Sequence, residues 1–110
     1  MAEPTLQQVF GANATQDATT LTIAKADLAA VGLNALASNT AESLWVAVLL
    51  QASEYLTPEN LELNAEQQVA IEESTVQTLV TRNNSSYRQV SFTVDLQTPD
   101  INFQLDPDSF

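Results

Sequence analysis

The sequence predicts an α+β fold, in which one long central helix and a short helical turn pack on a small, mostly antiparallel sheet of three to four strands. Residues 41–56 have the composition and length of a helix, whereas residues 19–24 and 75–97 alternate apolar and polar side chains with the period of a strand. A chain of 110 residues is of the size that one hydrophobic core serves. We therefore expect a single α+β domain over residues 19–98.

The first 18 residues are expected to form a flexible N-terminal arm. Leu6, Val9 and Phe10 are isolated apolar positions, and a small, polar stretch follows them at residues 11–17. Such a terminus either frays or docks its apolar side chains on the body or on a neighbouring subunit. Fraying is the favoured expectation.

Residues 19–24 predict the first strand, because Leu21 and Ile23 alternate with threonines. Residues 26–31 then predict a short helix, and Gly32 is placed to end it in the left-handed conformation. A turn is expected to follow as far as residue 38.

The helix over residues 41–56 is the best-defined element. Asn39 is expected to cap it, and Glu42, three residues later, to return a hydrogen bond to the cap. Thr57-Pro58 ends the helix, because the residue before a proline avoids the helical region.

Between Leu44 and Leu50 this helix is apolar on all sides, unlike a surface helix with one apolar stripe. Either it is covered on several sides within the domain, or part of its surface meets another copy of the chain. Both interpretations stay open. Trp45 is expected to pack in the core, and Tyr55 is expected to keep its hydroxyl in water.

Residues 59–64 are expected to be a connection with a short extended piece. The next segment, residues 65–74, has two interpretations. Asn64 and Gln67 form a second candidate capping box for a helix, whereas Val69 and Ile71 alternate with their neighbours as in a strand. We favour the strand, because Ile71 falls off the face that the other apolar residues would share in a helix.

Residues 75–82 and 87–97 predict a β-hairpin, joined by residues 83–86, which favour turns. In the second strand, one face is expected to carry Val90, Phe92, Val94 and Leu96. Residues 99–110 are expected to form an extended acidic C-terminal tail, in which residues 101–105 could pair at a sheet edge or dock on a partner.

Charge excludes several partners. Fourteen acidic residues against three basic ones give a formal charge of −11, which repels nucleic acids and anionic membranes. The longest apolar run, residues 44–50, is far shorter than the roughly 20 residues that cross a bilayer. The first residues do not resemble a signal peptide, so we expect a cytoplasmic protein.

Residue types also disfavour catalysis. The chain has no histidine and no cysteine, and its only basic side chains are Lys25, Arg82 and Arg88. Most acid–base and nucleophilic mechanisms need such groups, and zinc needs His or Cys ligands. We therefore predict a protein that is not an enzyme, and we assign no catalytic residue, cofactor or metal site.

Weaker candidates have simpler explanations. Glu72 and Glu73 would point to opposite faces of a strand, and no serine–lysine signature surrounds Lys25. Arg82 and Arg88 flank the predicted hairpin turn, where arginines can anchor protein contacts, but we favour pairing with local carboxylates. Three matches to the glycosylation pattern, at residues 13–15, 83–85 and 84–86, are expected to be accidental. Four aspartates near the C-terminus lack the spacing of a calcium loop and fit a solvated tail: Asp95, Asp100, Asp106 and Asp108.

The favoured function is a non-catalytic structural or protein-interaction subunit that self-associates, by analogy with small bacterial or phage-type assembly proteins. The apolar helix, the neutral polar surface and the two termini that could dock support this expectation. The alternative is an acidic binding or regulatory module that occupies a basic protein partner. The expected partner is thus the chain itself or another protein, and neither nucleic acid nor membrane.

Overall fold

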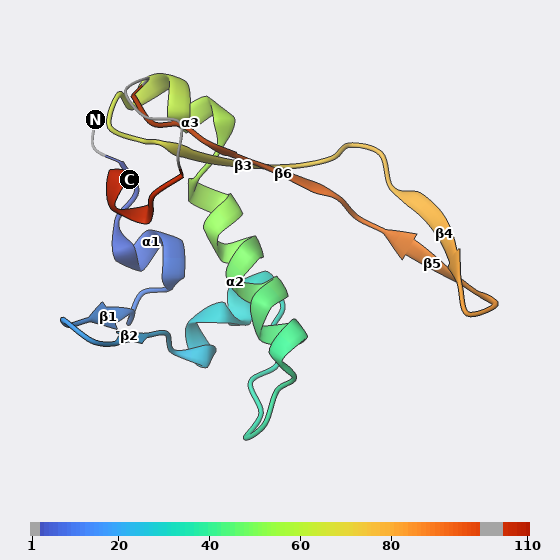
Figure 1. The fold of residues 1–110 in the computed structure, drawn as a ribbon. Helices are drawn as coiled ribbons and strands as arrows, with labels where there is room; N and C mark the ends of the chain where they lie inside the picture. The colour runs from blue at the N-terminus through green and yellow to red at the C-terminus, as the bar shows by residue number, and fades with distance from the viewer. Residues whose placement is uncertain (1–2, 100–104) are drawn as a thin grey trace.

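In the computed structural model, which describes residues 3–99 and 105–110, helices and antiparallel strands confirm the α+β class (Figure 1). The helices fill the first half of the chain, and the longer strands fill the second half. The helical elements are α1 (Leu6–Phe10), the 3-10 helix η1 (Lys25–Val31), α2 (Ala41–Tyr55), α3 (Pro58–Leu63) and the 3-10 turn η2 (Pro107–Ser109). The strands are β1 (Thr15–Gln16), β2 (Leu21–Thr22), β3 (Val69–Glu73), β4 (Thr78–Arg82), β5 (Ser85–Gln89) and β6 (Phe92–Leu96).

The expected N-terminal arm contains a short helix that lies against α2. In α1, the Thr5 hydroxyl accepts a hydrogen bond from the Gln8 backbone N–H at 3.2 Å, and the Gln8 side chain accepts one from the Thr5 N–H at 2.9 Å. This capping box satisfies two donors at the start of the helix. The Gln51 amide of α2 donates to the Gln8 carbonyl at 2.9 Å. The division into arm, domain and tail stays a prediction.

The strand that was expected over residues 19–24 is reduced to β2, which pairs with β1 in a small antiparallel hairpin. Leu21 in β2 remains half exposed. The short helix that follows is confirmed as η1, with Gly32 ending it at a φ of +105° and Leu28 buried beneath it. That φ suits glycine because a Cβ would be strained there.

Helix α2 begins one residue later than the predicted cap implies. Thr40 is the N-cap, and its hydroxyl accepts a hydrogen bond from the Ser43 N–H at 3.1 Å. The prediction that Asn39 caps the helix is wrong, because the Asn39 side chain instead bridges the Leu36 N–H and the Asn34 carbonyl in the preceding turn. The predicted end of the helix is confirmed at Tyr55.

Residues 58–63 form a helix, so the prediction of a partly extended connection over residues 59–64 is wrong. The Thr57 hydroxyl caps α3 by accepting a hydrogen bond from the Asn60 N–H at 3.1 Å. Pro58 occupies the first turn, where its lack of an N–H costs nothing. The proline that ends α2 therefore also starts α3.

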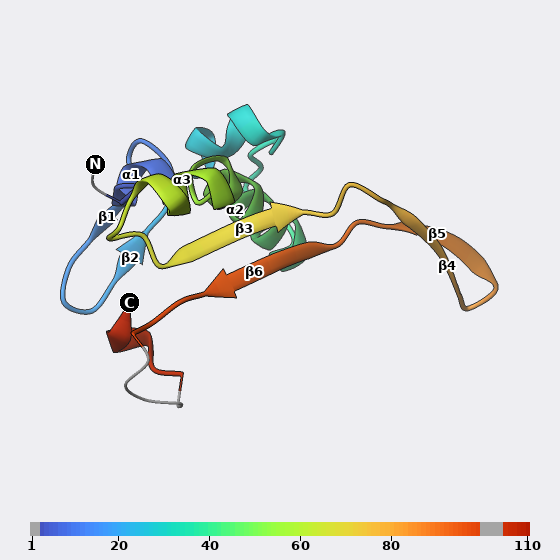
Figure 2. The ribbon, with the colours of Figure 1, turned by 90° about the horizontal axis from the view of Figure 1, so that it is seen from above.

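The second half of the chain is a long two-stranded ribbon (Figure 2). Residues 69–73 confirm the favoured strand, and β3 pairs with β6, whereas β4 pairs with β5 farther out. One backbone bond, from the Ser74 N–H to the Ser91 carbonyl at 2.8 Å, links the two ladders. The strand predicted over residues 87–97 is thus split into β5 and β6. With β1–β2, the described strands form three two-stranded sheets where one sheet of three to four strands was expected.

The turn at the tip of the ribbon confirms the predicted hairpin. Asn83 and Asn84 both have positive φ, of 50° and 61°, and they connect the paired residues Arg82 and Ser85. Two successive residues of this kind match the right-handed twist of a tight hairpin, and asparagine adopts the conformation at low cost.

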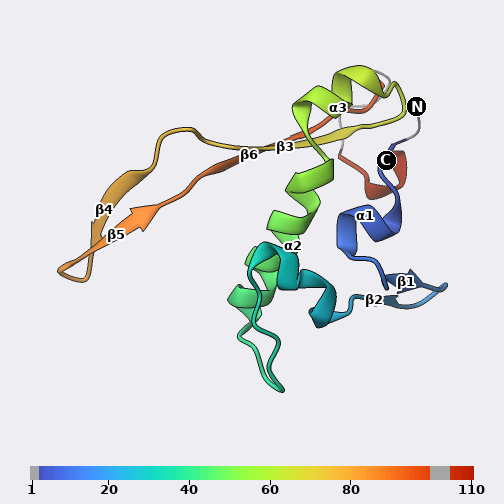
Figure 3. The same ribbon diagram turned by 180° about the vertical axis from the view of Figure 1, so that it is seen from behind.

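The described core is small. Its buried apolar residues are mostly alanines, and the larger ones are Leu28 and Ile71. Trp45 is 65% exposed, so the prediction that it packs in the core is wrong. The outer part of the ribbon, β4 and β5, lies away from the helices, so it does not cover the exposed part of α2 (Figures 1 and 3).

The C-terminal residues lie near the start of β3. The Gln68 amide donates to the Gln97 carbonyl and to the Ser109 carbonyl, each at 3.0 Å. The expected extended segment over residues 101–105 lies outside the described residues except for Leu105, which is exposed.

Candidate protein-interaction surfaces

One side of α2 presents apolar side chains to water. Trp45 and Val46, near the start of the helix, are both more than half exposed. An open groove of about 320 Å³ lies beside them, between the end of η1 and α2. We call it the α2 groove, and it is lined by Val31, Gly32, Leu33, Glu42, Ser43, Val46, Ala47 and Leu50. Its walls are mainly apolar, with one carboxylate.

The outer part of the ribbon is a second exposed apolar element. We call residues 74–91 the β-arm. It comprises β4, β5 and the residues that connect them to the inner ladder. Leu79 is 70% exposed, and Val76, Tyr87 and Val90 are also exposed. The β-arm projects from the body, and none of the helices in the described part of the chain lies against β4 or β5 (Figure 2).

Charge is distributed unequally between the β-arm and the rest of the chain. Two of the three basic residues, Arg82 and Arg88, lie in the β-arm, which has no acidic residue and a formal charge of +2. The remaining residues hold all fourteen carboxylates and one lysine, which gives a formal charge of −13. The β-arm is therefore a cationic projection from an anionic body.

Within the described residues, neither arginine pairs with a carboxylate, contrary to the prediction. The Arg82 guanidinium lies over the Tyr87 ring at 4.6 Å from its centroid, and Arg88 donates to the Gln77 side chain at 3.3 Å. The β-arm has no carboxylate within it, which is the physical reason. The first contact is a cation–π interaction, and it orders Arg82 on one face of the ribbon.

The register of the ladder separates the two arginines. Val80 is paired with Tyr87, and Leu79 is paired with Arg88. Because successive side chains of a strand point to opposite faces, Arg82 and Tyr87 share one face, whereas Leu79 and Arg88 share the other. Each face thus combines an apolar side chain with a guanidinium.

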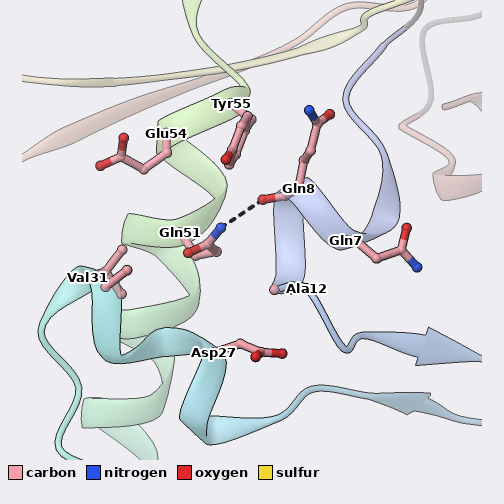
Figure 4. A pocket seen from close by; sticks show the side chains of 10 residues that line it. Gln7, Gln8, Ala12, Asp27, Val31, Gln51, Glu54 and Tyr55 are labelled. Carbon is pink, nitrogen blue, oxygen red and sulfur yellow. Dashed lines mark hydrogen bonds between the residues drawn. The ribbon is translucent and has the colours of Figure 1, made fainter.

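A larger cavity of about 540 Å³ lies between α1, η1 and α2 (Figure 4). Half of the residues that line it are polar, three glutamines and the carboxylates Asp27 and Glu54, and the other half are small, aliphatic or aromatic. The Asp27 carboxylate accepts hydrogen bonds from the Asn13 N–H at 2.7 Å and from the Asn13 side chain at 2.8 Å. This carboxylate therefore holds the N-terminal segment in place.

Two buried amides lie where α3 meets β3. The Gln67 side chain donates to the carbonyls of Thr57 and Val69, at 3.2 and 2.8 Å. Asn64 ends α3 and is also buried. They do not form the candidate capping box, because no helix follows them. The Gln67 side chain thus ties the residue that caps α3 to the first residue of β3.

The acidic candidates do not converge. Glu72 is paired with Thr93 and Glu73 with Phe92, so the two neighbouring carboxylates point to opposite faces of the ribbon, as expected. Within residues 3–99 and 105–110, no group of three or more metal-ligating side chains is placed to hold an ion. Asp100, one of the four candidate calcium ligands, lies outside the described residues. The Asp106 side chain caps η2 by accepting from the Asp108 N–H at 3.0 Å.

No helix in the described part of the chain combines the length and the apolar character needed to cross a membrane. Comparisons of the chain with protein-family models, with curated proteins and with solved structures give no match. The interpretation of function therefore rests on the exposed apolar and charged surfaces described above.

Sequence reasoning did not find the β-arm as a candidate site, although its signal is in the sequence. Residues 74–91 have no acidic residue in a chain with fourteen of them, and they include two arginines. That pattern becomes informative only once the ribbon is known to project from the body.

Proposed function

We propose that this protein is a non-catalytic structural subunit that self-associates. The observation that carries the proposal is the exposure of large apolar side chains on two separate elements, α2 and the β-arm. Water-exposed apolar patches on small proteins are typical of interaction surfaces. The analogy with small bacterial or phage-type assembly proteins and a cytoplasmic location remain part of the proposal.

The overall dimensions support this proposal. The radius of gyration is 16.2 Å, whereas a globular domain of this length has about 13 Å. The accessible surface is 8238 Å², compared with roughly 5,900 Å² for a compact monomer of this mass. The excess is larger than the roughly 800 Å² that each partner buries in a standard protein–protein interface.

The small hydrophobic core also supports self-association. An isolated chain gains most of its stability from apolar area removed from water. Here the large apolar side chains of Trp45 and Leu79 stay mostly exposed, so they gain little from the folding of one copy. Association would bury them and add the missing stabilisation.

The test is the oligomeric state of the purified chain. Sedimentation velocity is measured from about 1 μM to 1 mM, the range of weak to moderate protein affinities. We expect a mass that rises with concentration, and a shift of the single tryptophan's emission to shorter wavelength as Trp45 leaves water. A mass that stays that of one chain throughout would contradict the proposal.

The alternative, an acidic module that occupies a basic protein partner, is supported by the −13 charge outside the β-arm. This alternative predicts a monomeric chain that binds a basic probe protein such as lysozyme at low salt. Binding should be lost at moderate salt, because exposed charges are screened beyond about 10 Å at 0.1 M ionic strength.

A further inference from the structure

The β-arm and the α2 groove have complementary properties. The β-arm has a formal charge of +2 and carries an exposed leucine next to a guanidinium, whereas the α2 groove combines apolar walls with the Glu42 carboxylate on a body of charge −13. Opposite charge favours encounter of the two surfaces, and burial of apolar area holds them together.

The β-arm projects away from η1 and the first turns of α2, as Figures 1 and 3 show from opposite sides, and these are the elements that line the α2 groove of the same chain. The nine residues from Ser74 to Arg82 at the turn span about 26 Å at the rise of a β-strand. This length suffices to reach past the edge of the body and onto a neighbouring molecule. A β-arm that fills this groove must therefore come from a second copy of the chain.

Leu79 and Arg88 are the pair on the β-arm best suited to the groove. They face each other across the ladder, so they lie on the same face of the ribbon. Leu79 is the most exposed large apolar side chain of the β-arm, at 70%. In the described part of the chain, the Arg88 guanidinium donates one long side-chain hydrogen bond, to Gln77 at 3.3 Å, so it can turn to a carboxylate at little cost.

We propose that the β-arm of one copy docks in the α2 groove of a second copy, with Leu79 entering the apolar groove and Arg88 pairing with Glu42. This inference rests on the proposed self-association and names its interface. The two surfaces differ, so the contact is heterologous. Each copy offers one β-arm and one groove, and the contact therefore builds rings or open chains of copies.

The test compares two charge reversals on the β-arm. Arg88→Glu and Arg82→Glu change the net charge equally and lie on the same ribbon, but they lie on opposite faces. We expect Arg88→Glu to weaken association at least tenfold by sedimentation, and Arg82→Glu to weaken it much less. Leu79→Ser should also weaken association at least tenfold. Circular dichroism verifies that each variant keeps its fold.

A compensating change tests the partner side. We expect Glu42→Arg alone to weaken association, and the double variant Arg88→Glu with Glu42→Arg to return it to within about threefold of the wild type, as a coupled pair requires. Equal losses for Arg88→Glu and Arg82→Glu, or no rescue in the double variant, would overturn the proposed contact.

A competing interface between copies is the outer edge of β6. The pairing of Ser74 with Ser91 and of Gln68 with Gln97 places the backbone groups of Val94 on the edge away from β3. Val94→Pro would therefore block pairing of β6 with another copy while sparing the ladder to β3. If Val94→Pro abolishes association and Arg88→Glu does not, the β-arm proposal is wrong and self-association stands. If the wild type is monomeric throughout, self-association itself is wrong.

Discussion

Asp27 and Asn13 are joined by two hydrogen bonds, one from the Asn13 backbone N–H and one from its side chain, at 2.7 and 2.8 Å. They connect residues 14 positions apart in the sequence. The N-terminal segment that the sequence suggested would fray is thus anchored to η1 through a single carboxylate.

Replacing that carboxylate should loosen the N-terminal segment. We expect Asp27→Ala to lower the free energy of unfolding by about 1–2 kcal/mol, because it removes two hydrogen bonds to a charged acceptor near the surface. Urea denaturation measures the loss. The matched control is Asn13→Ala, which removes only the side-chain bond and should cost less. Equal midpoints for Asp27→Ala and the wild type would show that the contact adds no stability.

The two glycines offer a controlled comparison of strain. Gly11 has a φ of +116°, and a Cβ there would lie 2.8 Å from the Cβ of Asp27. Gly32 has a φ of +105°, with no atom within 4 Å of the place of its Cβ. In each alanine variant the positive φ is expected to lower the free energy of unfolding by about 1–2 kcal/mol, but only Gly11→Ala adds a steric clash. We expect the melting temperature of Gly11→Ala to fall farther than that of Gly32→Ala, and the reverse order would contradict this packing.

The buried Gln67 side chain should contribute more to stability than that of its half-buried neighbour Gln68. Gln67 and Gln68 each donate two hydrogen bonds to backbone carbonyls, but Gln67 is only 4% exposed. Gln67→Ala removes the side-chain donor to the Val69 carbonyl, at a cost of about 1–3 kcal/mol, although the Thr57 carbonyl keeps its bond from the Leu61 N–H. The Gln68 contacts lie at the surface, where water replaces the lost donors. Chemical denaturation of the two variants gives the comparison. A larger loss of unfolding free energy for Gln68→Ala would contradict this expectation and would show that the contact with the C-terminal residues contributes more.

The β1–β2 turn should respond to acid. Hydrogen bonds from the Thr19 backbone, and then from the Thr20 side chain and backbone, lower the pKa of the Asp17 carboxyl. A lowered folded-state pKa means that the carboxylate stabilises the turn above the unfolded pKa, and that this stabilisation is lost as the pH falls through the folded value.

An NMR titration between pH 2 and 6 should give an Asp17 midpoint below the roughly 3.9 of a free aspartate. The amide shifts of Thr19 and Thr20 should follow it. In Asp17→Asn these amide shifts should lose that transition, and an unshifted Asp17 midpoint would contradict the turn geometry.

Local signals were the most reliable guide from sequence to structure. Gly32 correctly marked the end of η1, Pro58 the end of α2, and the Asn83-Asn84 pair the hairpin turn. Each is a backbone requirement of a particular residue type. The prediction of Asn39 as the cap failed because Thr40, the next residue, favours that position as well, and the turn before α2 uses the Asn39 side chain for itself.

How the helices and strands pack on one another was harder to predict from the sequence. An apolar run such as residues 44–50 shows that a helix can be covered, but it does not show what covers it, and Trp45 proves to be exposed. Alternation over residues 87–97 predicted one strand paired with residues 75–82, but it could not reveal that this strand is split and that its second part, β6, pairs with β3. The interaction surfaces share this limit, because exposure depends on where distant segments lie.

The interruption between the two ladders of the ribbon has a mechanical consequence. Between the inner pair β3–β6 and the outer pair β4–β5, the Ser74–Ser91 bond is the described backbone link. Such a joint bends more easily than a continuous ladder, so the outer pair can change direction while the inner pair stays fixed to the helices. Filaments or rings held together through this joint would tolerate a range of curvatures, and their diameter would be set by what surrounds them as much as by the subunit.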